Sequence, residues 1–148
     1  MIGIDTNLLL YSLNPASEWH DGAVSFLRQN FGVSSVRVGI ADYVLVELYI
    51  HLRNPVVMAH PLSAEAARDL VISYLKIPNV MRIENATIMD EVWALAGGKN
   101  FARRRIFDAR LALTLRHAGV THLATSNVKG FQGWGFEKVW NPLIVSST

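Results

Sequence analysis

Three carboxylates stand in stretches of the sequence that are otherwise apolar: Asp5, Glu47 and Asp108. Asp5 follows the opening segment MIGI, Glu47 interrupts the segment VLVELYI, and Asp108 begins an apolar stripe that continues at Ala112 and Leu115. Burying an ionised carboxylate without a partner is unfavourable. These three positions are therefore where we expect chemistry.

If the three acids meet in the fold, their mutual repulsion raises at least one pKa and destabilises the metal-free site at neutral pH. A divalent cation reverses that effect. The sequence has no Cys, and its five His show no spacing suited to Zn²⁺. An all-oxygen site favours Mg²⁺ or Mn²⁺. Such an ion activates water and bridges phosphate oxygens, so the pattern predicts phosphodiester hydrolysis.

Asn127 is a fourth candidate because it follows the segment THLATS, at the expected end of a strand. Its side-chain oxygen can ligate a hard cation or hold a water that does so. Each position also has an ordinary structural interpretation: a helix N-cap for Asp5, the partner of a buried Arg for Glu47, a first-turn helix acid for Asp108 and a turn residue for Asn127. The chemical prediction therefore depends on all four converging.

Short apolar segments alternate with longer helical ones along the chain, with no repeat and no low-complexity tract. This alternation predicts an α/β fold with a parallel sheet wrapped by helices. Ligands of such sheets bind at the carboxyl ends of the strands, where Asp5 and Asn127 are expected. We expect strands at 1–4, 36–40, 80–83, 121–125 and 137–140, a short helical turn at 127–131, and helices at 8–13, 16–29, 43–53 after an Asp42 N-cap, 63–75, 86–95 after an Asn85 cap and 106–118.

The composition suits one domain over residues 1–148, because the chain is 51% hydrophobic and 18% charged. The absence of Cys excludes a disulfide scaffold, a zinc ribbon and a cysteine nucleophile, and it fits a reducing cytoplasm. The most apolar stretch, VGIADYVLVELYI, is interrupted by Asp42 and Glu47. We therefore expect no association with a membrane and no targeting signal.

Basic residues are concentrated in one part of the chain. The net charge is only +2, yet residues 99–129 carry seven Lys and Arg against the single acid Asp108, a local charge of +6. Such clusters often contact the phosphates of a nucleic acid, although a solvated basic face gives the same pattern. The candidates for contacting a nucleic-acid substrate are Arg103, Arg104, Arg105 and Arg110.

Four motifs occur in order: DTN after the opening strand, VELY in a helix, FDARLA in a later helix, and LATSN followed by Phe131. Together they resemble the PIN domain, and most closely its VapC-type toxin ribonucleases, over essentially the full length. The longest similar stretch is RIFDARLALTLRHAGVTHLATSNVKGF. The resemblance implies a three-layer α/β/α fold with a central parallel sheet. It also implies a metal-dependent enzyme that cleaves RNA, usually a homodimer, which a cognate antitoxin neutralises by inserting into the acidic cleft.

The resemblance extends to individual residues. Asp5, Glu47 and Asp108 are similar in position to the family's acidic ligands. In the mechanism that this implies, Asp5 and Asp108 bind the ion, Glu47 ligates it or orients the attacking water, and Asn127 holds a water or the scissile phosphate. Supporting polar residues lie on the same motifs: Thr6, Asn7, Thr125 and Ser126.

The sequence departs from the usual PIN pattern at two positions. Many PIN nucleases carry Asp where Asn127 stands, and an Asp before the Phe is common where this chain has Gly130. We therefore expect one firmly held ion, with a second bound only with substrate. The alternative is a catalytically degraded PIN-like module that acts as an RNA- or protein-binding scaffold. Three intact acids favour the nuclease.

Overall fold

A parallel sheet forms the centre of the computed structural model, which describes residues 1–84 and 87–144. Its strand order is β3-β2-β1-β4-β5, and every pair of neighbours runs parallel. This confirms the parallel sheet expected from the sequence. The strands are β1 (Ile2–Ile4), β2 (Val38–Ala41), β3 (Val80–Ile83), β4 (His122–Ala124) and β5 (Lys138–Trp140).

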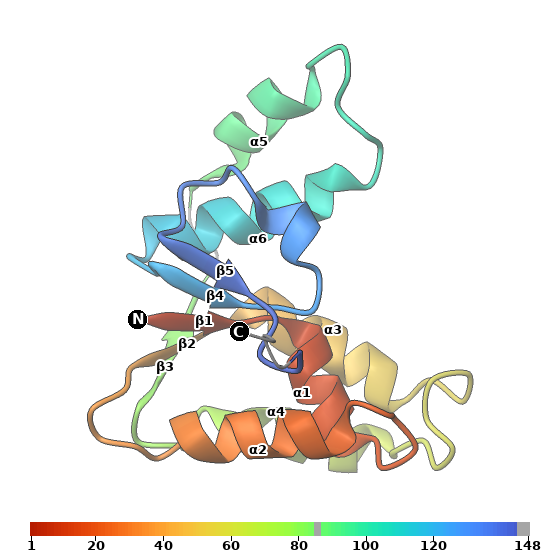
Figure 1. The fold of residues 1–148 in the computed structure, drawn as a ribbon. Helices are drawn as coiled ribbons and strands as arrows, with labels where there is room; N and C mark the ends of the chain where they lie inside the picture. Colours follow the sequence, from red (N-terminus) through yellow and green to blue (C-terminus); the bar gives the residue numbers. More distant parts are fainter. Residues whose placement is uncertain (85–86, 145–148) are drawn as a thin grey trace.

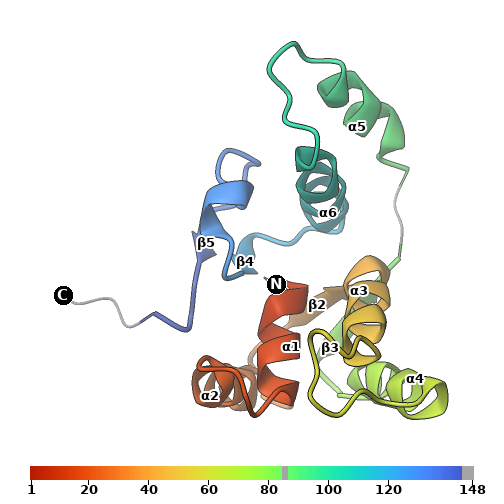
Figure 2. The same cartoon turned by 90° about the vertical axis from the view of Figure 1, so that its right-hand side faces the viewer.

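Helices lie on both faces of this sheet, as Figures 1 and 2 show. One face is covered by α1 (Thr6–Leu13), α2 (His20–Asn30), α3 (Asp42–Leu52) and α4 (Ala64–Tyr74). The other face carries α6 (Arg105–His117), with the 3₁₀ helix η1 (Val128–Phe131) packed beside it and α5 (Met89–Ala96) on its outer side. The three-layer α/β/α arrangement is therefore confirmed.

The order of connections makes a switch point between β1 and β4. The chain leaves β1 toward β2 and β3, crosses back to β4, and then continues outward to β5. Neighbouring strands whose connections leave in opposite directions open a crevice at their carboxyl ends, where ligands of such sheets bind. Asp5 follows β1 and Thr125 follows β4, so both lie at this crevice.

Aliphatic side chains fill the space between the layers. Each large one that is removed from water contributes roughly 1.5–3 kcal/mol to folding. The residues that are completely buried include Ile4, Leu8, Leu9, Val38, Ile40, Val44, Leu48, Leu115 and Leu123. Within residues 1–84 and 87–144, no helix is long and apolar enough to cross a membrane.

Helix starts differ most from the sequence prediction. Helix α1 begins at Thr6 rather than Leu8, because the Asp5 carboxylate accepts the Thr6 N–H at 2.7 Å. Helix α2 begins only at His20, because the preceding residues form a turn in which the Ser17 hydroxyl accepts the Trp19 N–H at 3.1 Å. Local side-chain hydrogen bonds decided both boundaries.

Three further boundaries also move. Strand β2 starts at Val38, because the N–H of Val36 is used in a turn with Val33. Asp42 is the first residue of α3, after Ala41 at the N-cap. The expected cap Asn85 lies outside the described residues, and α5 begins at Met89.

Candidate active site

Asp5 is fixed at the crevice by hydrogen bonds from two elements. Its Oδ1 accepts the backbone N–H of Thr6 at 2.7 Å, and its Oδ2 accepts the hydroxyl of Thr125 at 2.7 Å. Its own N–H donates to the carbonyl of Ala124 in β4 at 3.1 Å. Asp5 is therefore both the N-cap of α1 and a buried carboxylate, only 8% exposed, at the carboxyl end of the sheet.

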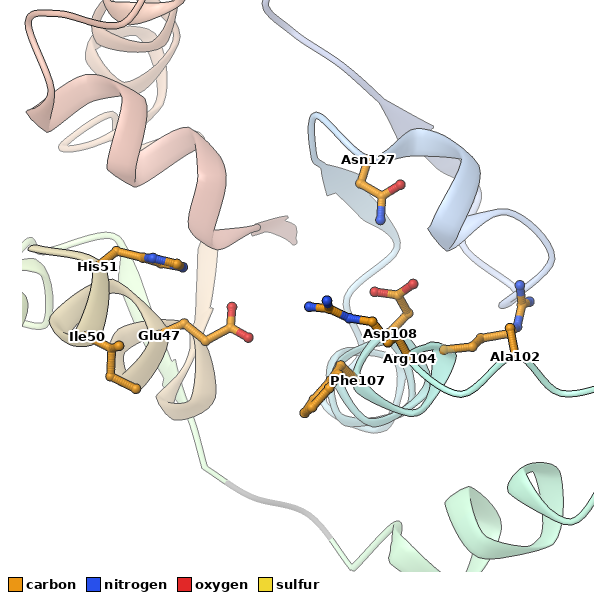
Figure 3. A pocket seen from close by; sticks show the side chains of 9 residues that line it. Glu47, Ile50, His51, Ala102, Arg104, Phe107, Asp108 and Asn127 are labelled. Atoms are coloured by element: carbon orange, nitrogen blue, oxygen red, sulfur yellow. The ribbon is translucent and has the colours of Figure 1, made fainter. Parts of the chain in front are cut away.

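Glu47 is linked to the same junction through Thr6. The Thr6 hydroxyl, almost fully buried, donates to Oε2 of Glu47 at 2.8 Å. On the helical face of Glu47, Val44 is completely buried but Ile50 is 57% exposed. Glu47 therefore lies at the edge of the buried face of α3. Figure 3 shows its carboxylate pointing across the pocket toward Asp108.

Asp108 enters from the opposite wall, in the first turn of α6. Ala112 and Leu115 below it are completely buried, which confirms the predicted stripe. Partial burial raises the pKa of Asp108, the charge of Arg105 opposes this rise, and the charge of Glu47 adds to it. The amino end of the helix favours an anion at this position.

A cavity of about 140 Å³ joins these side chains. All four predicted chemical positions line it, and they come from four separate parts of the chain. The structure places no three His, Cys, Asp or Glu side chains within 1–84 and 87–144 close enough to hold one ion together. The lining residues are Asp5, Thr6, Asn7, Tyr43, Glu47, Phe107, Asp108, Leu111, Asn127 and Phe131.

Asn127 is held by the loop that follows β4. Its N–H donates to the Thr125 hydroxyl at 2.9 Å, and its Oδ1 accepts the N–H of Gly130 at 3.2 Å. Its amide nitrogen is directed toward Asp108 in Figure 3. The side-chain oxygen that the sequence offered to a cation is thus bonded within the loop. The Thr125 hydroxyl connects this loop to Asp5.

Gly130 explains one departure from the family pattern. A Cβ at this position would meet the side chain of Asn127 and lie 2.9 Å from Oδ2 of Asp108. An Asp there does not fit the arrangement of this chain. The loop after β4 is also bonded to α1, because Nδ2 of Asn7 donates to the hydroxyl of Ser126 at 3.2 Å.

The negative charge of the cavity is only partly offset, by the nearby Arg105. None of the ion pairs within the described ranges involves Asp5, Glu47 or Asp108. Burial raises the pKa of Asp5, hydrogen bonds from Thr125 and Thr6 oppose the rise, and the charges of Glu47 and Asp108 add to it. The cavity therefore concentrates negative charge that a cation would relieve.

The four candidate arginines lie in three different environments. Arg104 and Arg105 line a wider pocket of about 680 Å³ outside the acidic cavity. Arg103 is exposed and does not line it. Arg110 does not reach it either: its guanidinium lies 3.5 Å from the ring centre of Tyr43. Its Nε is buried and has no hydrogen-bond partner among the described residues.

Tyr43 is the polar residue that sequence reasoning missed. Burial and the adjacent negative charge of Glu47 raise its pKa to about 12, against the opposing charge of Arg110. Tyr43 precedes Glu47 by four residues, and residues four apart share a helical face. That spacing was the available signal. Phe107 and Leu111 carried no comparable signal, because their exposure to the cavity depends on how α6 is placed.

The fold and the acidic cavity together define a PIN-domain protein. Solved structures with this fold include the VapC20 toxin of Mycobacterium tuberculosis, described as cleaving the sarcin-ricin loop, at a TM-score of 0.67 and 15% identity over 92% of this chain and 96% of that one. FitAcB from Neisseria gonorrhoeae has a TM-score of 0.62 and 19% sequence identity, over 98% of this chain and 100% of that one. VapBC2 from Rickettsia felis, bound to a DNA fragment of its promoter, has a TM-score of 0.61 and 18% sequence identity, over 95% of this chain and 98% of that one.

The sequence assigns the chain more closely. No family model matches it. It is 46% identical, over 143 residues and 97% of both chains, to ribonuclease VapC24 of two Mycobacterium tuberculosis strains, CDC 1551 / Oshkosh and ATCC 25618 / H37Rv. The chain belongs to the VapC family of PIN-domain ribonucleases, as its motifs indicated.

Proposed function

We propose that this protein is a Mg²⁺- or Mn²⁺-dependent endoribonuclease, the toxin of a VapBC-type pair that acts in the cytoplasm. The observation that supports this most is the cavity at the switch point, which is lined by Asp5, Glu47 and Asp108 from three separate elements. Thr6 donates to two of these acids. The 46% identity to a ribonuclease supports the choice of RNA as substrate.

The donor atoms around the cavity fit a hard divalent cation. The three charged residues of the lining are all carboxylates, and no His of the described residues lines the cavity. Each oxygen of Asp5 accepts one hydrogen bond, which leaves it a further lone pair for a ligand. Mg²⁺ keeps several waters and needs only one or two carboxylates, so Asp5 and Asp108 suffice to hold it. Mg²⁺ or Mn²⁺ would supply a Lewis acid for the phosphate and a more acidic water.

The residues of the chain would then have distinct tasks. Glu47, with Oε2 held by Thr6, has Oε1 available to orient the attacking water or to take its proton. Asn127, with its oxygen bonded to Gly130, has an amide N–H available for a phosphate oxygen. Thr125 keeps Asp5 and Asn127 in register. Arg104 and Arg105 would hold the RNA backbone in the wider pocket.

Partners follow from the family and from the surface. The solved relatives named FitAcB and VapBC2 support an antitoxin as the natural inhibitor, one that would insert into the acidic cleft. Large apolar side chains are exposed on α3 and α5, which supports a homodimer or an antitoxin contact there. They are Val46, Ile50, Trp93 and Leu95.

A direct cleavage assay tests the proposal. The purified protein is incubated with single-stranded RNA in Mg²⁺, in Mn²⁺ and in EDTA, beside an Asp108→Asn variant. We expect cleavage with either ion and none in EDTA or with the variant. RNA binding without cleavage under all conditions would instead indicate the degraded scaffold.

A further inference from the structure

The wider pocket and the acidic cavity lie side by side. They share four lining residues, so a molecule in the wider pocket would contact the same side chains that surround the acids. At about 680 Å³ the wider pocket is large enough for one nucleotide, because small-ligand pockets typically measure roughly 300–1,000 Å³. The shared residues are Glu47, Phe107, Asp108 and Asn127.

An exposed aromatic ring lies on one wall. Phe107 precedes Asp108 on α6, lines both hollows and is 50% exposed. Figure 3 shows it on the α6 wall beside Asp108. A large apolar ring so close to a carboxylate contributes little to the fold while it remains in water. A nucleobase stacked on its face would remove it from water and gain stacking energy.

A polar group lies on the opposite wall. His51 follows Glu47 by one helical turn on α3, and Figure 3 shows its ring on the side that faces the pocket. Its Nδ1 is buried and has no hydrogen-bond partner within the described part of the chain. Because Nδ1 is buried, a ligand in the pocket would meet the other edge of the imidazole, whose nitrogen can donate or accept one hydrogen bond.

The charge of the pocket matches the rest of a nucleotide. Arg104 and Arg105 line it and supply two cations for phosphate groups. The pocket thus has a flat apolar face, a polar group opposite it and cations at its edge. A peptide side chain has no comparable combination of planar ring, hydrogen-bonding edge and phosphate.

We propose that the wider pocket is a nucleotide subsite for the residue of RNA next to the scissile phosphate. Its base stacks on Phe107, and a polar edge of the base hydrogen-bonds to His51. The inference rests on the proposed ribonuclease function, and it names the residues that position the substrate for cleavage. Phe107 sets affinity for any base, whereas His51 sets the preference among bases.

The test combines a change in the protein with a change in the RNA. A cleaved oligonucleotide is compared with versions in which each base near the cut is removed in turn, leaving an abasic sugar. With the wild-type protein, removal at one position should raise the KM about 5- to 100-fold. Phe107→Leu should raise the KM for the intact RNA by a similar factor. Removal of the same base should then cause no further rise in the KM of this variant, because the stacking contact is already lost.

Phe107→Tyr keeps the aromatic face and should behave as the wild type. Ile72→Ala, at a residue on α4 that is 43% exposed and does not line the pocket, is the surface control and should retain the abasic response. Equal sensitivity of Phe107→Leu and the wild type to every abasic site would overturn the subsite. A changed oligomeric state of Phe107→Leu in sedimentation, with RNA binding intact, would overturn it too and mark a protein contact.

The failure of the subsite can be told apart from the failure of the function. If the wild-type protein cuts no RNA, the proposed function is wrong. If it cuts RNA and Phe107→Leu stays sensitive to the abasic site, only the subsite is wrong. His51→Ala should keep the abasic response but lose about 2- to 10-fold in preference among the four bases at that position. An unchanged preference would exclude His51 from the subsite.

Discussion

The hydroxyl of Thr6 donates to Oε2 of Glu47 at 2.8 Å, across 41 residues of sequence. The backbone N–H of Thr6 donates to Oδ1 of Asp5 at 2.7 Å. One buried residue therefore fixes two of the three carboxylates that line the cavity. The other oxygen of Asp5 accepts a hydrogen bond from the hydroxyl of Thr125, which follows Thr6 by 119 residues in the sequence. Two threonines thus hold Asp5 and Glu47 in place.

Replacing Thr6 by Val removes the hydroxyl and keeps the shape of the side chain. Glu47 then loses the hydrogen bond from Thr6, and a hydrogen bond to a charged group contributes roughly 1.5–3 kcal/mol. We expect single-turnover RNA cleavage to fall about 10-fold or more. Thr6→Ser keeps the hydroxyl and should stay near the wild-type rate. Equal rates for the Val and Ser variants would exclude a role for this bond.

Asp5→Asn should abolish cleavage and yet stabilise the metal-free protein at neutral pH. Burial raises the pKa of Asp5 in the fold, so the folded state favours the protonated form. That contribution to stability is complete below the unfolded pKa of about 3.9 and is lost as the pH rises through the folded pKa. In EDTA, urea unfolding of the wild type and the variant should therefore coincide at acid pH and diverge at pH 7. A variant less stable than the wild type at pH 7 would contradict this.

Gly130→Ala places a methyl group against Asn127 and 2.9 Å from Oδ2 of Asp108. Overpacking of this kind typically costs about 1–3 kcal/mol, and here it also displaces two groups of the cavity. We expect lower stability together with a loss of cleavage. Gly22→Ala is the matched control, because its new Cβ would come no nearer than an ordinary 3.5 Å to its nearest neighbour, Leu143. If Gly130→Ala keeps full activity, the packing around Asn127 is irrelevant to the reaction.

Arg104→Ala should weaken RNA binding in a salt-dependent manner. Each phosphate contact with single-stranded nucleic acid contributes about 0.7 to the slope of log K against log salt. The slope should drop by about that amount, as measured by fluorescence anisotropy between low and moderate salt. Arg68→Ala removes an exposed charge on α4, where Arg68 pairs with Asp69, and should leave the slope unchanged. Equal slopes for the two variants would place the RNA elsewhere.

The sequence predicted the sheet, its helices and the four polar positions of the cavity, because each of these depends on local patterns. Asp5 directly follows β1, Asn127 lies in the loop after β4, and Asp108 begins an apolar stripe. Parallel strands bring their carboxyl ends to one edge of the sheet, so the sequence also indicated that Asp5 and Asn127 lie at the same edge. Glu47 was predicted less well, because its exposure depends on how far α3 tilts over the sheet.

Other features depended on tertiary packing. The basic cluster of residues 99–129 looked uniform, yet Arg104 lines the wider pocket while Arg110 lies over Tyr43. A count of charges cannot distinguish these environments. Hydrogen bonds between distant residues, such as that from Thr125 to Asp5, were equally invisible. Only the family resemblance suggested supporting roles for residues of these motifs.

Direct titration of Mn²⁺ into the metal-free protein, followed by calorimetry, tests the central claim without RNA. The wild type should bind one ion, and Asp5→Asn and Asp108→Asn should each weaken binding at least 10-fold, or about 1.4 kcal/mol. Glu65→Gln, at an exposed acid on α4, should bind as the wild type does. If the wild type binds no ion, or if the Asp5 and Asp108 variants bind it equally well, these carboxylates do not form a metal site.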